Sequence, residues 1–231
     1  MVTVNPRETF DNELRKLKDG VLVLGSMVKQ NTLESVDALK RRDVKASKRV
    51  YLYDRKINEK RFELENKCVT LIATQQPMAR DMRSLASTLE VLTELERMGD
   101  YAKGIGRIGM MLSERPPLKP LIDLPLMAEI CTEMLHQALT AFVNEDEPLA
   151  RSIPPEDDKV DALYNQIYRE LITFMLADPG AIDRANYLLW AAHNLERFGD
   201  RVINICERTV YVATGTMEEL DVSDDESGEL E

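Results

Sequence analysis

The sequence has few of the residues on which most metal-thiolate and nucleophile sites depend. Its 231 residues include three cysteines and two histidines. Cys68, Cys131 and Cys206 are dispersed within apolar segments, so we expect buried, reduced thiols, as in a reducing cytoplasm. Two distant histidines leave little room for a zinc site or for histidine-driven catalysis. No Ser-His-Asp, Cys-His or glycine-rich phosphate-loop pattern is present, and we predict a protein that is not an enzyme.

Long apolar runs are also missing. No stretch approaches the roughly 18 apolar residues that a membrane-spanning helix needs. The first residues lack a basic segment followed by an apolar one, which is the pattern of a secretory signal. We therefore expect a cytoplasmic protein that reaches a membrane only through its partners. The absence of a basic patch interleaved with aromatic residues disfavours nucleic-acid binding.

The net charge of −11 comes largely from one end of the chain. No basic residue follows Arg208, and the segment 216–231 holds eight acidic residues. Without that segment the formal charge is about −3. The segment has few apolar residues, which predicts a disordered acidic tail over residues 215–231.

Glycine and proline are scarce inside long stretches and cluster between them, which is typical of an all-α protein. Phe10, Leu14, Leu17 and Val21 alternate steps of four and three residues, as the buried side of a bundle helix does. Pro77 and Pro179 suit the first turns of helices, and Asp178 suits an N-cap. We predict six long helices, at about residues 7–42, 44–74, 77–112, 124–145, 156–176 and 179–213.

The second half of the chain repeats the first. Residues 95–100 read Leu-Glu-Arg-Met-Gly-Asp, and residues 195–200 match them at five of six positions. The segment 54–58 is echoed by 157–161, at an offset of 103 rather than 100. Two motifs in the same order indicate an internal duplication. We predict two tandem three-helix bundles, at 1–114 and 123–214, joined by a proline-rich linker at 115–122.

Each copy of the motif sets two carboxylates four residues apart on one helix face: Glu96 with Asp100, and Glu196 with Asp200. Like charges at that spacing destabilise a helix by about 0.2–0.5 kcal/mol. Both glutamates continue the apolar stripes of their helices, and Asp54 interrupts the stripe of the second helix. Buried carboxylates need a partner, a proton or a metal. Oxygen donors of this kind suit a hard divalent cation or iron.

Two other interpretations compete with a metal site. The acids could instead form ion pairs between helices, neutralised by Arg83, Arg97 and Arg197. A carboxylate-bridged metal oxidoreductase would need two Glu-x-x-His units. The chain has one, Glu133 with His136, which we interpret as an incidental feature of a helix.

Taken together, these motifs resemble the PhoU family of phosphate-transport and phosphate-signalling regulators. The resemblance rests on Gln-Pro-Met-Ala-Arg-Asp-Met-Arg at 76–83, on the motif at 95–100, and on the longer match at 194–205. It extends over about residues 7–214. It implies a cytoplasmic negative regulator that binds the ATPase subunit of a phosphate ABC importer and, in many bacteria, a phosphate-sensing histidine kinase. It also implies a homodimer.

The resemblance further implies multinuclear metal binding, often of iron, with magnesium, manganese or zinc as alternatives. Carried over by position, the ligands in the first half are Asp54, Asn58, Glu96 and Asp100. Those in the second half are Asp157, Asp161, Glu196, Asp200 and Asn204. The position equivalent to Asn204 is Gly104, next to Lys103. With one oxygen fewer and a positive charge nearby, the first half is the weaker candidate.

Overall fold

A computed structural model describes residues 6–220, and the described part of the chain is helical with no strand. The predicted all-α fold with two related halves is confirmed. The long helices are α1 (Pro6–Arg41), α2 (Val44–Gln75), α3 (Ala79–Leu112), α4 (Asp123–Asn144), α6 (Asp157–Ala177) and α7 (Ile182–Thr214). None of the helices among these residues is both long enough and apolar enough to cross a bilayer.

Three short elements refine the predicted boundaries. A six-residue helix, α5 (Glu147–Ser152), follows α4, because the Asp146 side chain caps it by accepting from the Leu149 amide at 3.1 Å. The 3-10 turn η1 (Pro154–Glu156) then leads into α6. Asp178 caps a second 3-10 turn, η2 (Pro179–Ala181), rather than α7 itself. The third helix begins after Pro77 rather than at it, with the Met78 amide donating to Asp81 Oδ2 at 3.2 Å.

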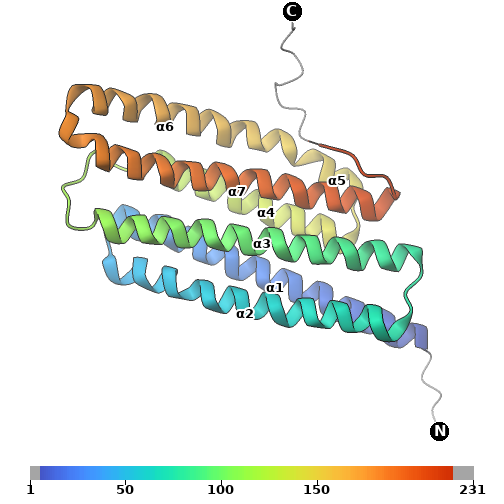
Figure 1. Cartoon of the computed structure of the whole chain (residues 1–231). Helices are drawn as coiled ribbons and strands as arrows, with labels where there is room; N and C mark the ends of the chain where they lie inside the picture. The colour runs from blue at the N-terminus through green and yellow to red at the C-terminus, as the bar shows by residue number, and fades with distance from the viewer. Residues whose placement is uncertain (1–5, 221–231) are drawn as a thin grey trace, which may run out of the picture.

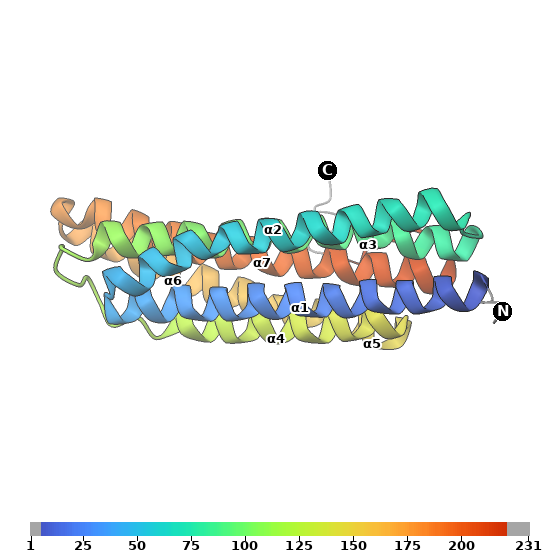
Figure 2. The same cartoon turned by 90° about the horizontal axis from the view of Figure 1, so that it is seen from below.

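The two repeats lie side by side along their whole length. Figures 1 and 2 show α1, α2 and α3 on one side and α4, α6 and α7 on the other, with α3 beside α7 and α1 beside α4. Both interfaces join the repeats, and buried residues from both contribute to one continuous core. All three cysteines are fully buried free thiols, as predicted.

The burial pattern supports the predicted duplication and its offset. Four buried positions of α2 have buried equivalents in α6, each 103 residues later in the sequence. The pairs are Asp54 and Asp157, Ile57 and Val160, Leu64 and Ile167, and Cys68 and Leu171. The same side of the helix therefore faces the core in both repeats, and a buried aspartate lies on it at the equivalent position each time.

Residues 215–220, the start of the predicted acidic tail, lie against the second repeat. Gly215 ends α7 in a left-handed conformation (φ 85°). Arg151 Nη2 donates to Glu218 Oε2 at 2.8 Å, and the Leu220 amide donates to Glu207 Oε1 at 3.1 Å. The rest of the tail, 221–231, lies outside the described residues.

Gly106 allows α3 to approach the backbone of α2. A Cβ atom there would lie 3.0 Å from Val50 Cγ1 and 3.1 Å from the Ser47 carbonyl oxygen. We expect Gly106→Val to lower the free energy of unfolding by about 1–3 kcal/mol, because a backbone neighbour cannot move aside as a side chain can. Urea denaturation measures this change.

Gly104→Ala is the matched control. A Cβ atom there would lie 3.1 Å from Nδ2 of Asn194, the movable end of a side chain. Removing a mid-helix glycine contributes up to about 1 kcal/mol, so this variant should be neutral or stabilised. A Gly106→Val protein as stable as the parent would contradict close packing of α2 on α3.

Candidate functional site

The two acidic clusters lie where the last helix of each repeat packs against its second helix. In the first cluster Asp54 is buried, with 6% of its surface exposed, whereas Glu96 is half-buried and Asp100 is exposed. In the second cluster Asp157 is buried, with 7% exposed, and Asp161, Glu196 and Asp200 are half-buried. The predicted core-facing position is thus confirmed for Asp54, and Asp157 is buried in the same way, while the two glutamates lie at the edge of the core.

Lys103 places its ammonium group within the first cluster. Its Nζ donates to Asp54 Oδ2 at 2.8 Å and to Asp100 Oδ1 at 3.3 Å. Asn58 Nδ2 also donates to Asp54 Oδ2, at 3.2 Å. Hydrogen bonding to Asp54 raises the pKa of Lys103, which keeps the ammonium charged. A cation that belongs to the protein therefore lies between the carboxylates of Asp54 and Asp100.

Arg61 is a second cation beside the first cluster, and we did not predict it. Its Nη1 lies 3.9 Å from Glu96 Oε1, while Nη2 is 2.8 Å from Glu65 Oε1. Burial raises the pKa of Glu96, Asp100 raises it further, and Arg61 opposes both. The 103-residue offset between the repeats places Tyr164 at the position equivalent to Arg61. This difference between the repeats could therefore have been found from the sequence alone.

The second cluster lacks counterparts of both cations. Tyr164 replaces Arg61, Ile203 replaces Lys103, and Asp161 replaces Asn58. Across the six equivalent positions, three carboxylates and two cations give the first cluster a formal charge of −1. Four carboxylates give the second a formal charge of −4.

The carboxylates of the second cluster repel one another, and burial adds to the effect on Glu196. Burial raises the pKa of Glu196, as do Asp200 and Asp161, while His193 lowers it from a distance of 3.0 Å. The nearby Cys131 thiol also has a raised pKa, chiefly from burial and then from Asp157 and other acids. Arg197 Nε lies 3.6 Å from Asp200 Oδ2. Such a concentration of negative charge favours a bound cation.

Gly199 makes room for the buried aspartate of the second cluster. A Cβ atom at this position would collide with Asp157 Oδ1. The glycine therefore lets α6 bring a carboxylate directly against the backbone of α7.

Asn204, the fifth predicted ligand of the second half, is half-buried on α7. Its equivalent, Gly104, faces α7, since a Cβ atom there would lie 3.1 Å from Asn194 Nδ2. Within residues 6–220, no three His, Cys, Asp or Glu side chains are already arranged to hold a metal ion.

The arginines of the predicted ion-pair network have mixed partners. Arg97 Nη1 donates to Glu94 Oε1 at 3.2 Å, and Arg201 Nη1 lies 3.6 Å from Glu94 Oε2, which links α3 to α7. Arg83 instead lies beside Gly215 at the end of α7. Glu133 and His136 are exposed on α4. The network thus joins the two repeats through a buried residue, Glu94, that we did not predict.

Comparison with known proteins identifies the family. The PhoU domain model matches the chain twice, over residues 21–109 and 124–209. The chain belongs to the PhoU family.

Relatives of the chain match it over nearly their full length. The phosphate-specific transport system accessory protein PhoU homolog of Aquifex aeolicus is 34% identical over 88% of this chain and 92% of its own length. The homolog of the same name in Deinococcus radiodurans is 35% identical over 92% of this chain and 100% of its own. The fold is that of the crystal structure of PhoU from Pseudomonas aeruginosa, with a TM-score of 0.84 and 33% identity over 90% of this chain and 100% of that one.

The raised pKa of Glu196 implies that ionised Glu196 lowers the thermal stability of the protein. A carboxyl whose pKa is higher in the folded than in the unfolded state destabilises the fold when ionised, and that cost disappears as pH falls through the folded pKa. We expect Glu196→Gln to melt about 2 °C above the parent at pH 7.5 in the presence of a chelator. The difference should shrink as the pH approaches the ordinary glutamate value of 4.5.

The exposed Glu90 provides the control, because Glu90→Gln removes the same charge from α3 without changing either cluster. Thermal denaturation followed by circular dichroism measures both variants across pH. An equal gain for the two variants would show that lower net charge, rather than the environment of Glu196, raises the melting temperature.

Proposed function

We propose that this protein is a non-enzymatic regulator of phosphate homeostasis that acts on a phosphate ABC importer. The observation that carries the proposal is the double match to the PhoU domain, in the order and spacing that the two repeats have in the structure. The Streptococcus pneumoniae structure described as a phosphate transport system regulatory protein, 31% identical over 90% of this chain with a TM-score of 0.83, supports a regulatory rather than a transporting role.

The proposed regulation is negative. In this proposal the protein binds the importer's ATPase subunit and a phosphate-sensing histidine kinase, and it damps both uptake and starvation signalling when phosphate is plentiful. It works in the cytoplasm as a homodimer and reaches the membrane only through these partners. The long exposed sides of paired helices offer the surface that such binding needs.

The second cluster is the proposed metal site. Asp157, Asp161, Glu196 and Asp200 supply oxygen donors, which suit iron, manganese or magnesium better than zinc. A divalent ion would offset two of the four formal negative charges, and it would hold α6 against α7 beside Gly199. Because the side chains are not already arranged around one point, binding would require them to turn inward.

The first cluster supports the alternative function, a structural module without metal. Lys103 and Arg61 already balance its acids with charges that belong to the protein. We therefore propose that the two repeats differ: the first is stabilised by internal ion pairs, and the second binds metal.

Metal content distinguishes the two clusters. The double variant Glu196→Ala with Asp200→Ala should lose most bound metal, whereas Glu96→Ala with Asp100→Ala should retain it. Elemental analysis of purified protein and titration with Mn²⁺ measure both. If the double change at positions 196 and 200 left the metal content unaffected, the assignment of the metal site to the second cluster would be wrong.

Reciprocal substitutions at one equivalent position provide a sharper control. Ile203→Lys brings to the second cluster the ammonium group that Lys103 supplies to the first, and should weaken Mn²⁺ binding at least about tenfold through charge repulsion. Lys103→Ile removes the cation from the first cluster and should not weaken binding. Equal effects of the two substitutions would favour a general loss of stability over a local site.

Negative regulation is tested in the organism that carries the gene. Deleting the gene should raise expression of phosphate-starvation genes in high phosphate, and the wild-type gene should restore repression. A pull-down with the importer's ATPase subunit should recover the protein. Unchanged expression after deletion would contradict the regulatory role, and recovery of the ATPase subunit alone would restrict the function to transport.

A further inference from the structure

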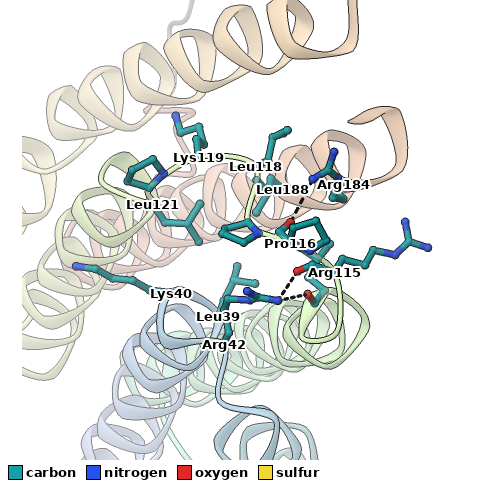
Figure 3. Close-up of a pocket in the computed structure, with 13 residues that line it drawn as sticks. Leu39, Lys40, Arg42, Arg115, Pro116, Leu118, Lys119, Leu121, Arg184 and Leu188 are labelled. Atoms are coloured by element: carbon teal, nitrogen blue, oxygen red, sulfur yellow. Dashed lines mark hydrogen bonds between the residues drawn. The ribbon is translucent and has the colours of Figure 1, made fainter. Parts of the chain in front are cut away.

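A cavity of about 430 Å³ lies where the linker between the repeats passes over the ends of α1, α3 and α7 (Figure 3). Its volume falls in the range of small-molecule sites, about 300–1,000 Å³. Most of its wall is apolar and consists of five leucines and three prolines. Figure 3 shows Leu39, Leu118, Leu121 and Leu188 surrounding this linker pocket.

All the charged residues that line the linker pocket are basic, although the chain has 41 acidic and 30 basic residues. They come from both repeats and from the linker between them, and they are Lys40, Arg42, Arg115, Lys119 and Arg184. An apolar pocket with a rim of one charge sign selects for a ligand of the opposite sign that also carries apolar surface.

Three of these cations fix the shape of the pocket. Arg42 donates through Nη2 to the carbonyl oxygen of Ser113 at 2.6 Å and also to that of Arg115. Arg184 Nη1 donates to the Pro116 carbonyl oxygen at 3.2 Å. Lys119 pairs with the carboxylate of Glu170. The linker is thus held by one arginine from each repeat, so the pocket is formed before any ligand arrives.

The other two cations are available to a ligand. Lys40 is exposed and forms no ion pair with any residue in 6–220. Arg115 pairs with Asp183 at 3.2 Å, but the two side chains are 44% and 70% exposed. Such an exposed pair contributes little and exchanges readily for another anion.

We propose that the linker pocket binds an amphipathic organic anion: an apolar body of small-molecule size with a carboxylate, sulfonate or phosphate group. The body would lie against the leucines and prolines. The acidic group would pair with Lys40 or with Arg115, whose charged ends lie on opposite sides of the pocket (Figure 3). A free inorganic anion would leave the apolar wall unfilled, whereas a neutral apolar molecule would leave the cations unused. The linker pocket shares no residue with the acidic clusters, so metal binding and ligand binding are tested separately.

A matched pair of probes tests both halves of the proposal. The first is 8-anilinonaphthalene-1-sulfonate, and the second is N-phenyl-1-naphthylamine, which lacks the sulfonate but has the same rings. Fluorescence titration of the full chain should give one saturable site that prefers the sulfonate. Lys40→Glu with Arg115→Glu should weaken sulfonate binding about tenfold and change binding of the neutral probe less than about twofold.

Two further variants make the result specific. Arg15→Glu changes an exposed cation near the other end of α1 and should leave both affinities unchanged. Leu118→Glu places a carboxylate in the apolar wall and should weaken both probes. Each variant should melt within about 3 °C of the parent, which shows that it folds.

Two outcomes would overturn the proposal. If the sulfonate probe bound the double variant Lys40→Glu with Arg115→Glu as tightly as it binds the parent, the probe would bind elsewhere on the surface. The same conclusion would follow if Arg15→Glu weakened its binding by the same factor as the double variant. A chain that ends at Leu220 and binds the sulfonate several times more tightly would identify the acidic segment 221–231 as the occupant of the pocket, in place of a small ligand.

Discussion

Each repeat buries an aspartate on the core-facing side of its second helix, and the arrangement around it follows from the need to balance that charge. An uncompensated buried carboxylate costs several kcal/mol, so each of these aspartates needs polar or charged partners. In the first repeat a lysine one helix away supplies the balance at 2.8 Å. In the second repeat the equivalent positions add carboxylates instead of cations, and the proposed metal site rests on this difference.

The duplication gives two copies of one helix arrangement, and the copies differ in the charges placed around the buried aspartate. The shared frame is the packing of the second helix on the last, with a glycine at the crossing point and an aspartate beside it. The differences lie at a few positions that change charge without changing the fold: Asn58 and Asp161, Arg61 and Tyr164, Lys103 and Ile203. In the first repeat Lys103 and Arg61 lie beside the acids, whereas the second repeat has four carboxylates and neither cation at the equivalent positions.

Periodicity and proline punctuation predicted the six long helices because both signals are local and extend over many turns. The short helix α5 was missed because six residues hold less than two turns of pattern. Contacts between the repeats could not be predicted from the sequence either, because no local pattern indicates that Glu94 on α3 pairs with Arg201 on α7. The acidic clusters could be predicted because the duplication repeats their residues in both halves. The presence of Lys103 near the first cluster could be predicted because this residue precedes Gly104, the equivalent of a predicted ligand. The contact between Arg61 on α2 and Glu96 on α3 depends on how the two helices are aligned in space, which the sequence does not give.

Helix α7 carries both candidate binding regions, and their charges are opposite. Arg184 belongs to the basic linker pocket, and Glu196 to the acidic cluster. Twelve residues of helix separate them, about 18 Å at 1.5 Å per residue. At physiological ionic strength the screening length is about 8 Å, so the two charged regions barely influence each other through solvent. A cation and an organic anion can therefore bind the same helix without competing, and any communication between them must pass through the packing of α7 against α3, α4 and α6.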